Sequence, residues 1–293
     1  MAEPKVECVL DARALIGESP VWCGRDRVLW WVDIKGRLVN RFDPSTGRNT
    51  AWQVSGPPGC LSLTEDGGVV LAMGDGFYRF DPSTGATSPL AVAEVDKPGN
   101  RMNDGRCDRA GRFWAGTMHD PPRPPQAEGT LYRLGLDGAV TAMVPDLIVS
   151  NGLAFSPDDR ILYLSDSNVA VRTIWAFDFD LAEGRIDNRR VFVDTRGMPG
   201  RPDGAAVDAD GCYWMAAADG WELVRFTPAG KIDRRIPVPV QKPSMPAFGG
   251  ADLRTIYVTS IGDGVDRTNQ PQAGGLFAVD AGVQGLEEPR FKG

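Results

Sequence analysis

Histidine is almost absent from this sequence, and that absence limits the chemistry available to the protein. His119 is the only histidine among 293 residues. A catalytic serine would have to pass its proton through this residue, and the chain has no G-x-S-x-G turn of the kind that presents such a serine. A metal site built mainly from histidines is excluded for the same reason. Hydrolytic or metal chemistry must therefore come mainly from other side chains.

Closely spaced cysteines are absent too. The five cysteines are scattered along the chain, at Cys8, Cys23, Cys60, Cys107 and Cys212. Their number is odd, and no pair has the short spacing of a zinc knuckle or a redox motif. We interpret them as small buried hydrophobic residues rather than as nucleophiles.

Runs of basic residues are also missing. The net charge is -7, which argues against nucleic acid or an anionic membrane surface as a partner. The N-terminal residues 1–5 lack the long apolar segment of a signal peptide, and no later stretch is long and apolar enough to cross a bilayer. We therefore expect a cytoplasmic protein, and the apolar content of 42% is typical of a globular chain.

Short apolar runs take the place of helical patterns, and 35 glycines and 23 prolines punctuate them. These runs are β-branched or aromatic and mostly alternate, which predicts strands. Six runs recur as the second strand of a repeat, at residues 29–33, 69–72, 113–116, 161–164, 212–215 and 255–258. A further strand and a turn follow each of them, and residues 39–47 have a near copy at 77–85, both ending in Asp-Pro-Ser-Thr-Gly.

Repeats of about 40 to 50 residues with four short strands are typical of propeller blades. The sequence therefore predicts an all-β fold, a six-bladed β-propeller with a central channel, formed by residues 1–293 as one domain. We expect residues 6–10, which precede the first repeat, to complete the last blade and close the ring. A two-sheet β-sandwich is the alternative, but it does not explain the even spacing.

Polar residues occupy one register in four of the six repeats. The repeats align on the aromatic residues of their second strands, which are Trp30, Trp114, Tyr163 and Trp214. Eleven or twelve residues ahead of these, just before the expected first strands, stand Glu18, Asn103, Asn151 and Asp203. Repeats two and six have Gly59 and Met245 nearby, which offer no side-chain oxygen. Because innermost strands line the channel of a propeller, we expect the four polar residues to gather at one of its mouths.

A simpler interpretation of these residues exists. Asn-Gly and Asp-Gly pairs are ordinary turn signals, and Glu18 would be a solvated loop residue. Turn propensity does not select a glutamate, however, so the shared register favours a common site. Two carboxylates and an amide carbonyl suit a divalent cation with open positions for water and substrate. Such an ion polarises a carbonyl group and brings a water molecule into attacking range.

Several longer motifs resemble one known family. They are residues 17–22 (GESPVW), 101–105 (RMNDG), 116–118 (GTM), 150–154 (SNGLA), 201–204 (RPDG) and 248–250 (FGG). Their order and spacing over the full length resemble the SMP-30/gluconolactonase (regucalcin-like) family, and most of all its bacterial sugar lactonases. The resemblance implies a six-bladed propeller that acts on a small sugar lactone and uses one divalent metal ion, which is Ca²⁺, Zn²⁺, Fe²⁺, Mn²⁺ or Mg²⁺.

The resemblance also implies roles for individual residues. Glu18, Asn151 and Asp203 would hold the metal ion, Asn103 would lie beside metal and substrate, and Arg101 would donate hydrogen bonds to sugar hydroxyls. Asp203 is the candidate general base, because a metal-touching carboxylate can accept a proton from the attacking water.

The sequence departs from the animal relatives after residues 116–118, where His119 and Asp120 precede the proline-rich segment 121–125. Two interpretations of His119 stay open: a loop histidine bonded to a backbone carbonyl, or a contact to a substrate hydroxyl. The proline-rich segment is predicted to form a semi-rigid lid or rim.

The expected function is metal-dependent hydrolysis of an aldonolactone to the aldonic acid, by a monomer or weak homo-oligomer. Two other functions stay open, which are a non-catalytic regulatory propeller that binds a divalent cation and a phosphotriesterase-like hydrolase. Arg101 and His119 argue against the regulatory function, because a passive cation site needs no donors for a polyol.

Overall fold

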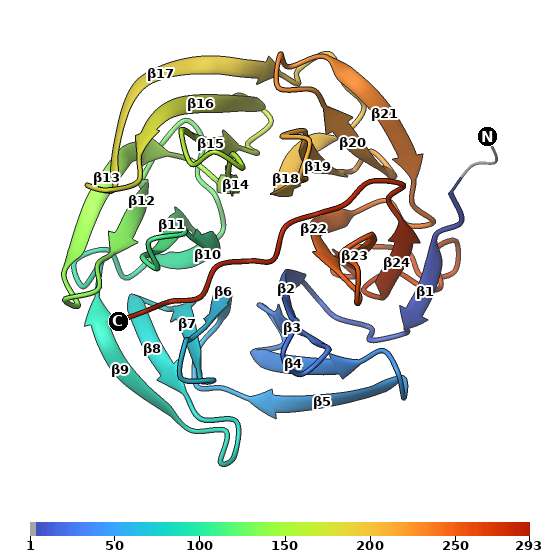
Figure 1. The fold of residues 1–293 in the computed structure, drawn as a ribbon, viewed down its shortest axis with the longest axis horizontal. Helices are drawn as coiled ribbons and strands as arrows, with labels where there is room; N and C mark the ends of the chain where they lie inside the picture. Colours follow the sequence, from blue (N-terminus) through green and yellow to red (C-terminus); the bar gives the residue numbers. More distant parts are fainter. Residues whose placement is uncertain (1–3) are drawn as a thin grey trace.

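Six four-stranded antiparallel sheets form a ring in the computed structural model, which describes residues 4–293 (Figure 1). The innermost strands are β2 (Gly17–Cys23), β6 (Pro58–Leu63), β10 (Asn100–Cys107), β14 (Ser150–Phe155), β18 (Arg201–Val207) and β22 (Pro243–Gly249). The second strands are β3 (Val28–Asp33), β7 (Val69–Met73), β11 (Phe113–His119), β15 (Ile161–Asp166), β19 (Tyr213–Ala218) and β23 (Thr255–Ser260). The predicted six-bladed propeller is confirmed, and the β-sandwich alternative is wrong.

The remaining strands form the outer half of each blade. The third strands are β4 (Leu38–Asp43), β8 (Gly76–Phe80), β12 (Gly129–Leu134), β16 (Thr173–Asp180), β20 (Glu222–Phe226) and β24 (Leu276–Asp280). The outermost strands are β5 (Arg48–Gln53), β9 (Thr87–Val92), β13 (Val140–Leu147), β17 (Arg185–Asp194), β21 (Ile232–Pro237) and β1 (Glu7–Leu10). Strand β1 pairs with β24, with Cys8 opposite Phe277, so the N-terminal segment completes the last blade as predicted. Residues 1–3, part of the predicted single domain, lie outside the described residues.

A hydrophobic cluster fills each interface between neighbouring blades. Examples are the cluster with Trp30 and Leu61 between the first two blades, and the cluster with Trp214 and Phe248 between the last two. The innermost and second strands are almost entirely buried, whereas outermost strands such as β17 are largely exposed. One blade alone would leave these apolar faces in water, so burial between blades stabilises the ring as a whole.

The polar residues of the shared register lie inside the innermost strands, so the prediction that they precede these strands is wrong. Each strand has an irregular register beside its polar residue, between Glu18 and Val21 in β2 and between Asn151 and Ala154 in β14. Strands β10 and β18 have the same feature. Such bulges bend a strand and redirect its side chains. The alternative interpretation of the Asn-Gly and Asp-Gly pairs as turns is therefore wrong.

The last residues of the chain, 281–293, cross the ring at the end of the channel where the innermost strands finish. We call this segment the C-terminal strap. Figure 1 shows it running from β24 over the centre toward β6 and β10. Gly285 forms a β-bridge with Asp208, and Phe291 forms another with Thr64 on a different blade. The strap therefore joins blades across the axis of the ring.

Two further expectations concern the chain as a whole. The five cysteines are free thiols, and all except the partly buried Cys8 are buried. Burial raises the pKa of the Cys107 thiol to about 12, so this thiol is not a nucleophile at neutral pH.

Nowhere in residues 4–293 does the structure contain a helix with the length and apolar character needed to cross a membrane.

Candidate functional site

Glu18 enters the channel from strand β2, through a strained piece of backbone. The next residue, Ser19, has φ of 49°, a left-handed conformation that is uncommon outside glycine. This turn brings the backbone N–H of Ser19 to Oε2 of Glu18, at 3.0 Å. In β14 the residue after Asn151 is also left-handed, and there it is Gly152. Glu18 is only 6% exposed, so its carboxylate is buried.

Asn103 and Asn151 form a continuous line of hydrogen bonds from β10 to Ser167, the residue that follows β15. The Asn103 amide donates from Nδ2 to the carbonyl oxygen of Ser150 at 2.8 Å and to Oδ1 of Asn151 at 3.2 Å. The Asn151 amide donates from Nδ2 to Oγ of Ser167 at 2.6 Å. Because Nδ2 of Asn151 donates to Ser167, its Oδ1 points away from Ser167 and toward Nδ2 of Asn103. Both asparagines are buried.

The buried carboxylates of the site act on one another. Burial, followed by the charges of Asp203 and Asp104, raises the pKa of Glu18 well above its ordinary value. Burial raises the pKa of Asp203 to about 7, although Arg201 acts in the opposite direction. The two arginines whose charges act on Asp203 form ion pairs elsewhere, Arg101 with Asp120 and Arg201 with Asp219. Among residues 4–293, neither Glu18 nor Asp203 forms an ion pair of its own.

This donor set fits a divalent cation. Within the described chain, no three or more His, Cys, Asp and Glu side chains come together as a metal site. The carboxylates of Glu18 and Asp203 are both buried. Oδ1 of Asn151 is a further oxygen donor, of a residue type outside those four. Buried carboxylates are costly unless a cation or hydrogen bonds compensate them. A hard or borderline divalent ion would supply that compensation.

Arg101 connects the mouth of the channel to Asn103. Its Nε donates to Asp120 at 2.7 Å, and its Nη1 donates to Oδ1 of Asn103 at 2.7 Å and to the carbonyl oxygen of Met102 at 3.0 Å. Asp120 is about half exposed, whereas the Arg101 side chain is 10% exposed. The guanidinium thus reaches from the rim to the buried amides, where it can position Asn103 and meet an entering ligand.

His119 ends strand β11, beside Asn100 of β10. Its Nδ1 lies 2.8 Å from the carbonyl oxygen of Pro121, which is the bond that the first interpretation of this residue requires. A Cβ atom on Gly99 would lie 2.3 Å from Nε2, so the ring packs closely against that glycine. The contact to a substrate hydroxyl stays a prediction. Residues 121–125, the proline-rich segment, are exposed and form no strand.

Two residues of the site were missed in the sequence. Asp104 accepts a hydrogen bond from the backbone N–H of Leu153 at 2.8 Å, and its second oxygen is buried with no partner among residues 4–293. Arg201 stands two residues before Asp203, as Arg101 stands two residues before Asn103, and both pair with an aspartate just after the second strand of their blade. The repeated Arg-x-Asn/Asp pattern is the signal that would have found Arg201.

Fold and site together define a six-bladed β-propeller with a buried carboxylate and amide cluster in its central channel. Residues 16–262 match the family model described as the SMP-30/Gluconolactonase/LRE-like region. The chain therefore belongs to this family, and the resemblance found in its motifs is confirmed.

Relatives of this chain extend over almost its whole length. A 6-deoxy-6-sulfogluconolactonase from Pseudomonas putida is 39% identical over 291 residues, which is 98% of this chain and 99% of the relative. A regucalcin from Xenopus laevis is 38% identical over 301 residues, with 100% of both chains covered. A solved structure of a calcium-binding protein, regucalcin, from Agrobacterium tumefaciens has a TM-score of 0.94 at 29% identity and 100% coverage of both chains.

Proposed function

We propose that this protein hydrolyses a sugar-derived lactone, an aldonolactone, to the aldonic acid with the help of one divalent metal ion. The observation that carries the proposal is the buried pair Glu18 and Asp203, which forms no ion pair among residues 4–293, together with the oriented amide of Asn151 on the strand between β10 and β18. Membership of a family that includes lactonases supports the same reaction class.

Glu18, Asn151 and Asp203 would hold the ion. When bound, a divalent cation supplies Lewis acidity that polarises the lactone carbonyl. Its charge also compensates the two buried carboxylates, which would otherwise favour their protonated forms. Ca²⁺, Zn²⁺, Fe²⁺, Mn²⁺ and Mg²⁺ all accept oxygen donors of this kind.

Asp203 is the proposed general base. Its carboxylate is buried in the channel, and in its ionised form it would accept a proton from the attacking water. Asn103 is the proposed donor to the developing oxyanion. Of the two hydrogen bonds that its Nδ2 donates, the longer one to Asn151, at 3.2 Å, is the one that a substrate oxygen would replace.

Arg101 is proposed to bind the hydroxyl groups of the sugar. Three of its donor interactions already hold the guanidinium against Asp120, Met102 and Asn103, so the remaining Nη2 donors are presented in a fixed orientation. His119 borders the same mouth and is proposed as a second contact to the substrate. The proline-rich segment 121–125 follows it and would form the rim of the entrance.

The first test is lactone hydrolysis by chelator-treated protein, followed through proton release as each divalent metal is added back. The panel contains five- and six-carbon aldonolactones, a 6-sulfonated gluconolactone because of the Pseudomonas putida relative, and an organophosphate triester. Metal-dependent turnover of one lactone class is the expected result. Faster turnover of the triester would instead favour the phosphotriesterase-like function.

Non-catalytic cation binding is the second candidate function. It is favoured by the relatives named regucalcin and by the similar solved structure described as a calcium-binding protein. Folded protein that binds one metal ion but hydrolyses no lactone with any metal would support it. Arg101 argues against it. Its guanidinium extends from the exposed Asp120 to the amide of Asn103, and a site that only binds a cation needs no such donor for a polyol.

A further inference from the structure

Arg106 occupies the channel between the site and the C-terminal strap. It lies on β10, three residues after Asn103, and its side chain is only 7% exposed. A buried guanidinium carries a large desolvation cost, so the groups that satisfy it show what it organises. Its partners come from three other segments of the chain.

Two of these partners are backbone carbonyls on the next two blades. Arg106 donates from Nε to the oxygen of Leu153 at 3.0 Å, and from Nη2 to the oxygen of Ala205. Leu153 stands two residues after Asn151, and Ala205 stands two residues after Asp203, within the bulged parts of β14 and β18. One planar guanidinium therefore links β10, β14 and β18 directly below the residues proposed to hold the metal ion.

Leu153 is held on both sides by side chains of β10. Its N–H donates to Asp104 at 2.8 Å, while its carbonyl accepts from Arg106. The backbone that carries Asn151 is thus fixed to the strand that carries Asn103 by two charged side chains. Sites of this kind lose function when their parts move by about half an ångström, so such fixation has consequences for binding.

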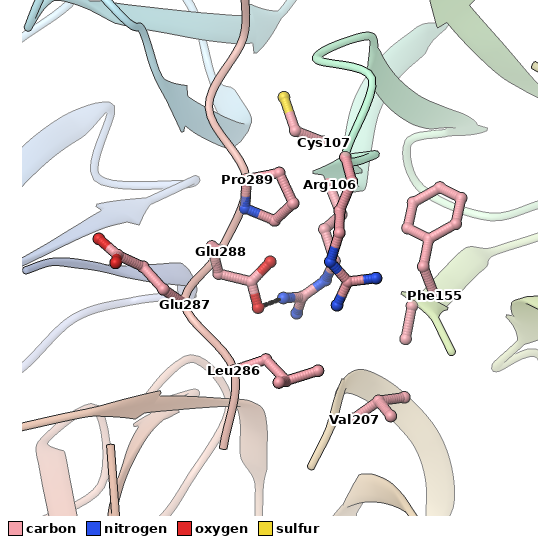
Figure 2. A pocket seen from close by; sticks show the side chains of 10 residues that line it. Arg106, Cys107, Phe155, Val207, Leu286, Glu287, Glu288 and Pro289 are labelled. Atoms are coloured by element: carbon pink, nitrogen blue, oxygen red, sulfur yellow. Dashed lines mark hydrogen bonds and ion pairs between the residues drawn. The ribbon is translucent and has the colours of Figure 1, made fainter. Parts of the chain in front are cut away.

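The third partner is Glu288 of the strap, which forms an ion pair with Nη1 of Arg106 (Figure 2). Figure 2 shows strap residues Leu286 to Pro289 passing beside this guanidinium, and the cavity between them is about 30 Å³, room for one water molecule. The strap itself is anchored on both sides: the N–H of Gly285 donates to Leu253 at 2.8 Å and the N–H of Phe291 to Leu63 at 2.8 Å. Glu288 is therefore held in place over the channel.

We propose that Arg106, held by Glu288 of the C-terminal strap, is a positioning residue for the cation site. It sets the spacing of Asn151 and Asp203 by linking the carbonyl groups just beyond them, and the strap keeps its guanidinium aligned. The inference rests on the proposed function in that Asn151 and Asp203 hold the metal ion. It assigns a role to Arg106 and Glu288, which the proposed function does not use.

The test measures Mn²⁺ binding by calorimetry in chelator-treated wild type, Arg106→Lys, Glu288→Gln and the double variant. Lysine keeps the charge but cannot serve three acceptors in fixed directions, so Arg106→Lys should weaken Mn²⁺ affinity about tenfold. Glu288→Gln should also weaken Mn²⁺ affinity. The double variant should lose less than the sum of the two losses, because the residues act as one unit.

Two control variants separate positioning from loss of stability. Glu287→Gln changes the exposed neighbour on the same strap and should bind Mn²⁺ as the wild type does. Phe291→Leu loosens the anchor of the strap, since Phe291 is 1% exposed, and should lower the melting temperature while keeping most of the Mn²⁺ affinity. At saturating metal, Arg106→Lys should lower kcat for the lactone and leave KM nearly unchanged, because Arg101 is untouched.

Unchanged Mn²⁺ affinity in both Arg106→Lys and Glu288→Gln would overturn the inference, even in an active lactonase. The inference would also be overturned if Phe291→Leu lost as much Mn²⁺ affinity as Arg106→Lys at an equal melting temperature. General loosening of the fold would then explain both losses. Wild type that binds Mn²⁺ but hydrolyses no lactone contradicts the proposed reaction alone, and the affinities still decide the inference. Wild type that binds no divalent ion contradicts both.

Discussion

Asn103 and Asn151 meet across the boundary between the third and fourth blades, where Nδ2 of Asn103 donates to Oδ1 of Asn151 at 3.2 Å. The oxygen that is expected to bind a metal ion is therefore already oriented by an amide from the neighbouring blade. Arg101 continues this line toward the rim by donating to Oδ1 of Asn103. Asp120 at the mouth of the channel is thus joined to the buried amides of Asn103 and Asn151 by one hydrogen-bond network.

Ser167→Ala should weaken metal binding about tenfold, because Ser167 accepts the hydrogen bond from Nδ2 of Asn151 at 2.6 Å and fixes its amide. Titration of chelator-treated protein with Mn²⁺ measures the effect. Ser165→Ala is the matched control, since Oγ of Ser165 is buried with no hydrogen-bond partner in the described part of the chain. Equal affinities for the two variants would show that Ser167 does not orient Asn151.

Asp203→Asn should lower kcat for the lactone on the order of 10³-fold, because an amide cannot accept the proton of the attacking water. The fold should stay intact, since asparagine has nearly the same shape. Steady-state kinetics with saturating metal measure the effect, and circular dichroism checks the fold. Near-normal turnover would show that the base, and with it the proposed ligand set, is assigned wrongly.

Metal-free protein should become less stable as the pH rises from about 4 to about 7. Burial raises the pKa of Asp203 from its ordinary value of 3.8 to about 7, so in this window the folded protein keeps a proton that the unfolded chain has lost. Each further rise in pH then favours unfolding, until the folded carboxyl also ionises. Added metal should restore the stability at high pH.

The measurement is the melting temperature in the presence of a chelator at pH 5 and pH 8. Asp203→Asn lacks the titrating group, so its melting temperature should fall less between the two values. Parallel changes in wild type and variant would show that ionised Asp203 is not destabilising in the folded protein.

Arg101→Lys should raise KM for the lactone about tenfold. Lysine keeps the positive charge, but its three donors lie on one nitrogen and cannot replace the separate Nε and Nη1 contacts while a further donor stays free for the sugar. Initial rates over a range of lactone concentrations give KM. Arg196→Lys, which alters an exposed ion pair with Asp194, should leave both kinetic constants as they are. An unchanged KM in Arg101→Lys would remove Arg101 from substrate binding.

Much of the fold could be predicted from the sequence because its signals are local. Alternating apolar residues and Asp-Pro-Ser-Thr-Gly turns predicted the strands, and their even spacing predicted six blades. The closing contact of β1 with β24 also followed, since residues 6–10 formed a strand without a partner in the first repeat. The bulges at Asn151 and Asp203 did not follow, because Asn-Gly and Asp-Gly pairs have the same local preference in a turn as in an irregular strand.

The sequence by itself determined that this protein is a propeller of the SMP-30/gluconolactonase family, with oxygen donors at one register in four repeats. Only the tertiary structure decided that Glu18 and Asp203 are buried close enough for the charge of Asp203 to raise the pKa of Glu18, since burial depends on ring closure. It also decided that Glu288 meets Arg106 from 182 residues away. Contacts across blade boundaries leave no periodic signal along the chain, because each of their partners lies in a different repeat.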